Sequence, residues 1–388
     1  MSKRKEYLPV HIIGHAKNNQ ANGVFFNPHT PNSRNAPGLT VITGYPGSGK
    51  TFLSQCLISN DVAMDKVVVA FDWKGDLSGV AANPELANKC SLVEIGRKED
   101  AGILDPFFST SDSSIKAERV LTLVEILMGG LDKRERSLVM PYISETMKDR
   151  KRRASMGTLI QKLMRDADTA VHSIGNTLDA ISKDHIGRIM FYKGERRPRP
   201  ISIGKGATIF TVLNLDLPAN EDDAKNTASG RNASAVFFMM TSLVSEMLLK
   251  PDGLEKSLYI DEAWAVLQTK AGQSLVQKAS LLGRSRGLAL ILATQNYKHF
   301  ADAEIGNTIS NHFAFASKTI DAKRAIRALE LPGRWVETIN SLDTGECIMK
   351  DMDGRVGVMR VSEADWNDGW ADWFNTNMYT NGQAAEAG

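Results

Sequence analysis

One eight-residue stretch limits what this chain can fold into more than any other feature. It matches the phosphate-binding pattern G-x-x-x-x-G-K-[ST] at every defined position. The residues are Gly44, Tyr45, Pro46, Gly47, Ser48, Gly49, Lys50 and Thr51. The apolar residues 39–43 before it are typical of a short buried strand, and residues 51–64, which begin with Thr51 and Phe52, are typical of a helix. A strand, a glycine-rich loop and a helix in this order predict an α/β fold with a nucleotide site at residues 44–52.

The chemistry of this loop explains its residue types. Glycine lets backbone N–H groups turn inward around a phosphate, which a Cβ atom would obstruct. The helix that follows adds its unpaired N–H groups and the positive end of its dipole. We expect Lys50 to reach the β- and γ-phosphates and the Thr51 hydroxyl to ligate Mg²⁺. ATP and Mg²⁺ are therefore the expected ligands.

Composition excludes several classes of protein. The 388 residues are 42% hydrophobic and 24% charged, with a net charge of +2, which is typical of a globular protein with two or three domain-like units. A net charge this small gives no global argument for nucleic-acid binding. The three cysteines form no C-x-x-C pair, and this indicates a reducing compartment. No apolar run approaches the ~20 residues that span a bilayer, so a cytosolic or peripheral protein is expected.

Strand and helix patterns alternate over most of the chain. Strands are expected at 39–43, 66–72, 92–95, 208–215, 258–260, 288–293 and 313–315, with a late hairpin joining 345–350 to 357–361. Helices are expected at 51–64, 233–249 and 272–282. This order predicts a mostly parallel central sheet with helices on both faces.

The pattern divides the chain into four parts. A lead segment with room for one strand covers 1–37, the α/β core covers 38–112 and 201–361, an inserted all-α subdomain covers 113–200, and an acidic tail covers 362–388. In the tail, Trp366, Trp370 and Trp373 fall on one face of an expected helix. This face either packs on the core or docks a neighbouring subunit or partner.

Basic residues gather in and beside the expected helical insert. They include the run at 148–153 and three arginines within 196–199. Such charges can contact nucleic-acid phosphates or a membrane-bound partner. A solvated helix face is the more ordinary interpretation, and from the sequence we favour it.

A second motif narrows the type of nucleotide protein. The apolar strand at 258–260 ends in Asp261 and Glu262. A carboxylate at the tip of such a strand can hold Mg²⁺, which we assign to Asp261, and Glu262 can take the proton of an attacking water. Together with the phosphate loop, this pair predicts an ATPase.

The third motif is a strand that ends in Thr294 and Gln295, preceded by Arg284 and Arg286. Because open α/β sheets bind ligands at the carboxyl ends of their strands, Gln295 is placed to sense the γ-phosphate or to position the water. Arg284 or Arg286 could reach the γ-phosphate of a neighbouring subunit as an arginine finger, or form a salt bridge at a helix end.

The blocks at 44–51, 258–264 and 283–295 together resemble the ATPases of type IV secretion and conjugative DNA transfer, within the HerA–FtsK group of ring-forming motors. Residues 71–76 and the hairpin at 345–361 also look like segments of that family, so the resemblance covers most of 38–361. It implies a RecA-like core, the Asp-Glu strand in the middle of the sheet, a homo-hexameric ring and ATP hydrolysis between subunits. It also implies partners among the inner-membrane secretion or conjugation proteins, and a cytoplasmic location at the inner membrane.

Two departures from that family bear on its role here. Secretion ATPases of this type usually carry a large domain before the phosphate loop, and coupling proteins carry N-terminal transmembrane helices. This sequence has a short lead in that place, so a stand-alone motor module or a fragment is expected. The hypothesis is an ATP-hydrolysing motor of conjugation or type IV secretion. The alternatives are a translocase or coupling protein that pumps DNA, and a nucleotide-gated scaffold with little turnover.

Overall fold

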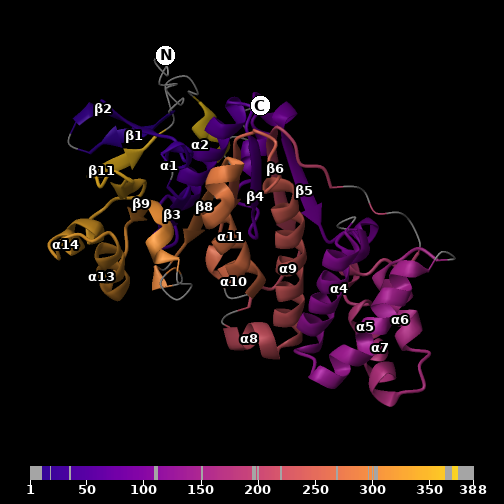
Figure 1. The fold of residues 1–388 in the computed structure, drawn as a ribbon. Coiled ribbons are helices and arrows are strands. Elements are labelled where there is room, and N and C mark those ends of the chain that lie inside the picture. The colour runs from indigo at the N-terminus through magenta and orange to yellow at the C-terminus, as the bar shows by residue number, and fades with distance from the viewer. Residues whose placement is uncertain are drawn as a thin grey trace, which may run out of the picture.

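The computed structural model describes residues 11–17, 19–34, 36–108, 112–149, 152–194, 198, 201–218, 221–267, 270–295, 297–298, 300, 305–362 and 369–374. In this part of the chain eleven strands form one sheet, in the order β2-β1-β11-β10-β9-β3-β8-β7-β4-β6-β5 (Figure 1). The predicted α/β class with a mostly parallel sheet is confirmed.

Seven neighbouring strands of this sheet, from β9 to β5, are parallel. They are β3 (Leu39–Thr43), β4 (Val67–Phe71), β5 (Cys90–Ile95), β6 (Gly206–Val212), β7 (Lys256–Ile260), β8 (Leu288–Thr294) and β9 (Ile309–Phe315). Every residue of β3, β4, β7 and β8 is buried, since helices cover both faces. The Asp-Glu strand β7 lies inside the sheet, between β8 and β4.

The other four strands are antiparallel and extend the sheet beyond β9. They are β1 (His11–Ala16), β2 (Asn19–Phe26), β10 (Glu346–Lys350) and β11 (Val356–Val361). The expectation of one strand in the lead segment is wrong, because the segment forms two. Its first strand pairs with β11 at the other end of the chain, with Gly14 opposite Val361. A pairing so distant in sequence leaves no local signal that a single segment could show.

Alternate side chains of the parallel strands enter two cores. In β4, Val67 and Phe71 face one core, which they share with Phe237, whereas Val68 faces the other, which it shares with Leu53. The first core lies under α9 (Ala228–Leu248), α10 (Ala263–Leu267) and α11 (Lys270–Arg286), and the second lies under α2 (Lys50–Ala63) and α3 (Ser78–Ala82). Helix α9 begins earlier than predicted, because the Thr227 hydroxyl caps it by accepting the Gly230 N–H (2.9 Å).

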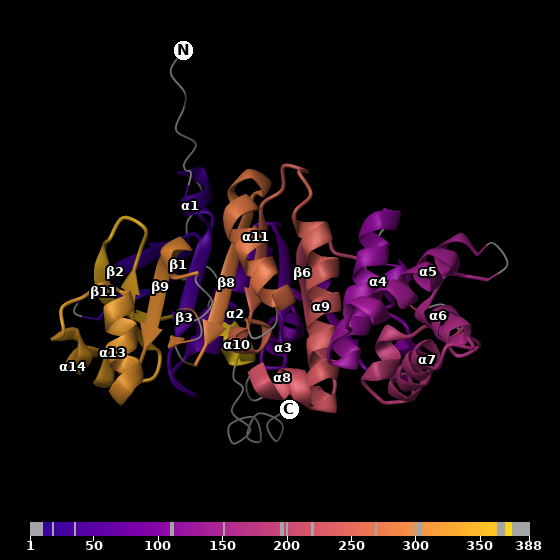
Figure 2. The same ribbon diagram turned by 60° about the horizontal axis from the view of Figure 1, so that its bottom comes forward.

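Among the described residues, four α-helices lie between β5 and β6 in the chain: α4 (Ser113–Met128), α5 (Lys133–Lys148), α6 (Met156–Leu163) and α7 (Thr169–Ile181). We call them the helical insert. Each begins at an Asp or Ser side chain that accepts a backbone N–H of the first turn. Helix α4 packs against α9, so the insert stands at one end of the molecule (Figure 2).

The remaining α-helices of the part that the structure describes are short. They are α1 (Thr30–Ser33), α8 (Glu221–Asn226), α13 (Thr319–Ala328) and α14 (Trp335–Asn340). Helices α13 and α14 lie at the opposite end of the molecule from the insert (Figures 1 and 2). Among the residues that the structure describes, no helix combines the length and the apolar character needed to cross a bilayer.

The tryptophans of the tail that the structure describes differ in their burial. Trp366 lies outside the described residues, and Trp370–Phe374 forms a short 3-10 helix, η7. Trp370 is buried in the second core and its Nε1 donates to Glu85 Oε2 (3.0 Å), whereas Trp373 is 46% exposed. Trp370 is therefore a core residue and Trp373 remains at the surface.

Candidate nucleotide site

The phosphate loop joins β3 to α2 and is held open by its glycines. Gly44 has φ +152°, and a Cβ atom there would lie 2.6 Å from the Cβ of Phe315. Gly49 has φ +110° and packs against Gly345, whose N–H donates to the Ser48 carbonyl (2.9 Å). Both positions require a residue without a side chain. No side chain caps α2 at Gly49, so the first N–H groups of the helix face the loop, as phosphate binding requires.

Lys50 lies inside this loop. Its side chain is buried, and Nζ donates to the carbonyls of Gly44 (2.9 Å) and Tyr45 (3.1 Å). Burial lowers the pKa of Lys50, while the charges of Glu262 and Asp261 act in the opposite direction. The ammonium group is thus placed within the curve of the loop, next to the two carboxylates at the end of β7.

Three side-chain donors hold the carboxylate of Glu262 in place. Lys74 forms an ion pair with Oε1, Gln295 Nε2 donates to the same oxygen (2.8 Å), and Trp264 Nε1 donates to Oε2 (2.9 Å). A carboxylate has about four lone-pair sites, so these three donors leave one for a water. Glu262 also has φ +48°, a strained backbone for a non-glycine residue, which is a feature that clusters at functional sites.

The charge of Glu262 is set by these partners. Burial alone would raise the pKa of Glu262, but the hydrogen bonds from Lys74 and Gln295 outweigh it and hold the pKa below its usual value. Glu262 is therefore ionised at neutral pH although it is 5% exposed. An ionised carboxylate is the form that can accept a proton.

Lys74 reaches Glu262 because of a tight turn after β4. The buried Asp72 carboxylate accepts the backbone N–H groups of the following residues: Lys74 (3.3 Å), Gly75 (2.8 Å), Asp76 (3.1 Å) and Leu77 (2.8 Å). This fold of the backbone carries the Lys74 side chain back across the end of the sheet. The turn is therefore part of the nucleotide site.

Asp261 has the properties of a metal ligand, because it is a buried carboxylate that pairs with no cationic side chain of the described residues. Burial, together with the nearby charges of Glu262 and Asp72, raises its pKa to about 6. Among the described residues it forms no ion pair, and its Oδ1 accepts the Glu262 N–H (3.0 Å). The described residues hold no cluster of three or more His, Cys, Asp or Glu side chains suited to a metal. Mg²⁺ in such a site relies on one carboxylate, a hydroxyl and substrate phosphates, which fits Asp261 and Thr51.

The structure thus brings Lys50, Asp261, Glu262 and Gln295 to the carboxyl ends of the adjacent strands β3, β8 and β7. It does not bring Arg286 there. Arg286 is the last residue of α11 and lies just before β8, whereas Gln295 follows the other end of that strand, roughly 20 Å away. The side chain of Arg284 lies outside the described residues. Neither arginine is therefore assigned to the site of its own chain.

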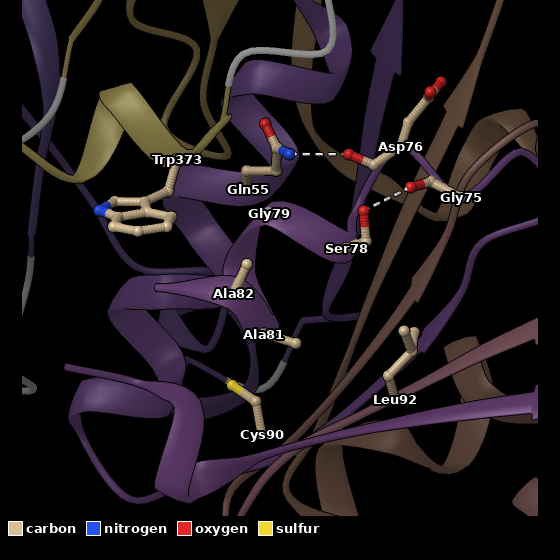
Figure 3. A pocket seen from close by; sticks show the side chains of 10 residues that line it. All are labelled: Gln55, Gly75, Asp76, Ser78, Gly79, Ala81, Ala82, Cys90, Leu92 and Trp373. Atoms are coloured by element: carbon tan, nitrogen blue, oxygen red, sulfur yellow. Dashed lines mark hydrogen bonds between the residues drawn. The ribbon is translucent and has the colours of Figure 1, made fainter. Parts of the chain in front are cut away.

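A cavity of about 670 Å³ lies beside the segment that contains Gly75 and Asp76 (Figure 3). Gly75 and Asp76 form one wall, and Leu92 of β5 and Trp373 lie on other sides. Gln55 of α2 joins the turn to the phosphate-loop helix, because its Nε2 donates to the Asp76 carbonyl (2.7 Å). The turn that presents Lys74 is thereby tied to the helix that carries Thr51.

No sequence pattern points to a role for Lys74, Trp264 or Asp72. The segment 71–76 resembles a family segment, and this resemblance alone gives none of its residues a role. The available signal in the sequence is the carboxylate of Asp72, which comes after a buried strand and is followed by Lys74 and Gly75. This pattern cannot show that the side chain of Lys74 returns to Glu262, because that contact depends on the turn.

Comparisons with known proteins agree with this geometry. A family model described as an AAA-like domain matches residues 23–365. Among solved structures, VirB4 of Thermoanaerobacter pseudethanolicus matches with a TM-score of 0.73 and 14% identity, covering 92% of this chain and 97% of that one. The bacterial conjugative coupling protein TrwBdeltaN70 in complex with sulphate matches with a TM-score of 0.57 and 14% identity, covering 93% and 94%. None of the curated proteins matches in sequence. At these identities the likeness confirms the predicted resemblance at the level of the fold.

Proposed function

This chain belongs to the family of AAA-like domains, and from that premise we propose that it binds ATP with Mg²⁺ and hydrolyses it. The observation that carries the proposal is the support of Glu262 by Lys74, Gln295 and Trp264 beside the phosphate loop. A scaffold that only binds nucleotide does not need an ionised carboxylate oriented by three donors. The site therefore supports turnover rather than binding alone.

Each residue then has a distinct task. The N–H groups of the loop and Lys50 bind the phosphates, and Lys50 balances charge that develops on them. Glu262 takes the proton of the attacking water through its remaining lone-pair site. Gln295 fixes Oε1 and stands where the γ-phosphate would be sensed. Thr51 and Asp261 would hold Mg²⁺, which supplies charge neutralisation at the β- and γ-phosphates when bound.

An arginine from a neighbouring subunit completes this assignment. Arg286 lies at the sheet edge opposite its own site, so it can serve only a site on another subunit. We assign the finger to Arg284 or Arg286 of that neighbour, within an oligomeric ring. An oligomeric ring would supply this arginine, because it sets a neighbouring subunit against each nucleotide site.

Two variants test the hydrolysis step. Lys50→Ala should lose ATP binding and turnover, whereas Glu262→Gln should bind ATP normally and hydrolyse it at least about 100-fold more slowly, since only the base is removed. Lys89→Ala is a matched control, because Lys89 is an exposed lysine that pairs with Asp65 away from the site. Binding is measured with a fluorescent ATP analogue and turnover by phosphate release. Wild-type turnover by the Lys50 variant would sink the assignment.

The likeness of the fold supports a proposal for the process that ATP hydrolysis drives. The likeness to VirB4 and TrwB supports a motor of conjugation or type IV secretion, acting at the cytoplasmic face of the inner membrane with the membrane proteins of that machine. The alternative is a motor that pumps DNA, which the excess of 18 Lys and Arg over 11 Asp and Glu in residues 113–200 favours. ATPase activity with and without DNA, on a sample sized by light scattering, separates the two. Strong, salt-sensitive stimulation by DNA supports the DNA pump.

A further inference from the structure

Two lysines come to the acidic end of strand β7 from opposite sides. In the order of the sheet, β8 and then β3 lie on one side of β7, and β4 lies on the other. Lys50 follows β3 through the phosphate loop, and Lys74 follows β4. Because these strands are parallel, both lysines start from the edge of the sheet at which Asp261 and Glu262 lie. The acidic pair is thus flanked by two cations.

The Lys74 ammonium keeps hydrogen-bond donors for a ligand. Among the described residues, its Nζ donates to one acceptor, Glu262 Oε1. An ammonium group has three N–H donors, so two of them remain. The Lys74 side chain is also half exposed, whereas the side chain of Lys66, which pairs with Asp61, is buried. The remaining donors of Lys74 are therefore accessible to a ligand that enters the site.

The backbone that carries Lys74 is fixed in two ways. The Asp72 carboxylate accepts four backbone N–H groups of the turn, and one of them belongs to Lys74 itself. Gln55 Nε2 donates to the Asp76 carbonyl (2.7 Å), which ties the turn to α2 (Figure 3). Since Thr51 lies in the first turn of α2, Lys74 is held in a constant position relative to the phosphate loop.

This position selects the γ-phosphate among the phosphates of ATP. A general base lies within about 3 Å of the attacking water, and the water lies within about 3.5 Å of the phosphorus that it attacks. Lys74 Nζ is bonded to the carboxylate that we assign as this base, and it stands on a flexible stem of four carbons. It can therefore reach the oxygens of the γ-phosphate. The β-phosphate lies at the loop, with Lys50 and the backbone N–H groups.

The charges of the site also favour this contact. Lys50 alone would leave the two carboxylates, Asp261 and Glu262, in excess, although ATP remains an anion when one Mg²⁺ is bound. With Lys74, two cations balance the two carboxylates. Burial lowers the pKa of Lys50, and the charge of Lys74 acts in the same direction, so the two ammonium groups interact. A phosphate that contacts both of them relieves this repulsion.

We propose that Lys74 binds the γ-phosphate of ATP while it stays paired with Glu262, so that the site distinguishes ATP from ADP. The proposal rests on the ATPase function proposed above. A lysine that only set the charge of Glu262 would treat the two nucleotides alike. Because Lys74 can make this contact with bound ATP and with the transition state, its loss should raise KM for ATP more than it lowers kcat.

The test compares the affinities of ATP and ADP, with Mg²⁺, by titration calorimetry of the full chain. The Glu262→Gln variant is the background, because it lacks the base and does not consume ATP during the titration. Adding Lys74→Met should weaken ATP binding about tenfold or more and ADP binding less than about twofold, since a hydrogen bond between charged groups is lost with ATP alone. Adding Lys74→Arg, which keeps the charge and the donors, should leave both affinities within about threefold of the background.

A second comparison separates a direct contact from an effect of net charge. Lys74→Met/Glu262→Gln has the net charge of the wild type, so an effect of charge alone would leave its preference for ATP over ADP at the wild-type value, which is measured with a non-hydrolysable ATP analogue. We expect a preference about tenfold lower. Retained ADP binding also shows that the site is folded.

Equal losses of ATP and ADP binding, or no loss of either, would overturn the role of Lys74. Either result leaves the proposed ATPase function standing if turnover still depends on Lys50 and Glu262. A wild-type protein that binds neither nucleotide would overturn both proposals. The two failures are therefore distinguishable.

Discussion

Strand β7 carries two carboxylate networks that differ in access to solvent. Near its start, Ser257 and Tyr259 donate to Asp61 Oδ2 (2.6 and 2.9 Å), and Lys66 Nζ donates to Oδ1 (2.9 Å). Past its end, Glu262 accepts hydrogen bonds from Lys74, Gln295 and Trp264. Both carboxylates have three side-chain donors, and both have lowered pKa values although burial alone would raise them.

The difference lies in what surrounds the donors. Asp61 is 1% exposed, Lys66 is also buried, and Ser257 is further bonded to the buried His29 Nε2 (3.0 Å). Glu262 stands at the edge of the sheet, and the Lys74 side chain that pairs with it is 45% exposed. The number of hydrogen bonds does not distinguish a structural carboxylate from a catalytic one. Access for water and phosphate is what distinguishes them. Asp61 is enclosed and fixes α2 against β7, whereas Glu262 is accessible and can react.

The largest expected effect follows from changing Asp61. Asp61→Asn removes the charge that Lys66 faces and leaves a buried ammonium with only a longer contact to Glu255 (3.4 Å). Breaking a buried ion pair in this way costs roughly 3–5 kcal/mol, which we expect as a loss in the free energy of unfolding in urea. The folded fraction that remains should still bind ATP.

The control for this variant is Asp65→Asn, two residues after α2. Asp65 is exposed and pairs with the surface residue Lys89 (2.7 Å). A surface pair contributes little, so the urea midpoint should stay at its wild-type value. If both variants unfold at the same urea concentration, the Asp61 network is not what fixes α2 to β7.

The positions of the main site residues were predictable for a simple reason. Lys50, Asp261 and Gln295 each follow an apolar strand, and the carboxyl ends of parallel strands share one edge of the sheet. Strand patterns alone therefore place these residues together. Their catalytic roles remain proposals.

The rest depended on interactions that the sequence pattern does not contain. The return of Lys74 to Glu262 needs four backbone N–H groups gathered by Asp72. The strand at His11–Ala16 needed a partner from the far end of the chain, and the edge strand at Asn19–Phe26 pairs with it in turn.

A smaller effect is expected from Lys74, and it sharpens the contrast with Asp61. Lys74→Met removes a hydrogen bond and a charge that lower the pKa of Glu262, so that pKa rises. The base is active when ionised, so the acid limb of the pH–rate profile should move to higher pH. Above that limb kcat should change by less than about tenfold, because Gln295 and Trp264 still orient the carboxylate.

Lys74→Arg keeps the charge and is the matched variant. Its acid limb should stay near that of the wild type, measured by phosphate release at saturating ATP between pH 5 and 8 in roughly half-unit steps. An acid limb of Lys74→Met that stays in place or moves to lower pH would show that Lys74 does not set the charge of Glu262.

The smallest effect is expected from Trp264, a neutral aromatic donor to Glu262. Trp264→Phe keeps an aromatic ring at this position and removes the N–H that bonds Oε2 (2.9 Å). Losing one hydrogen bond of about 1 kcal/mol should lower kcat roughly fivefold while ATP binding is retained. Phe has no hydrogen-bond donor, so the Glu262 carboxylate is freer to rotate and is less well oriented toward the attacking water. An unchanged kcat would mean that Lys74 and Gln295 alone hold Glu262, and that the network at the sheet edge is looser than the buried one around Asp61.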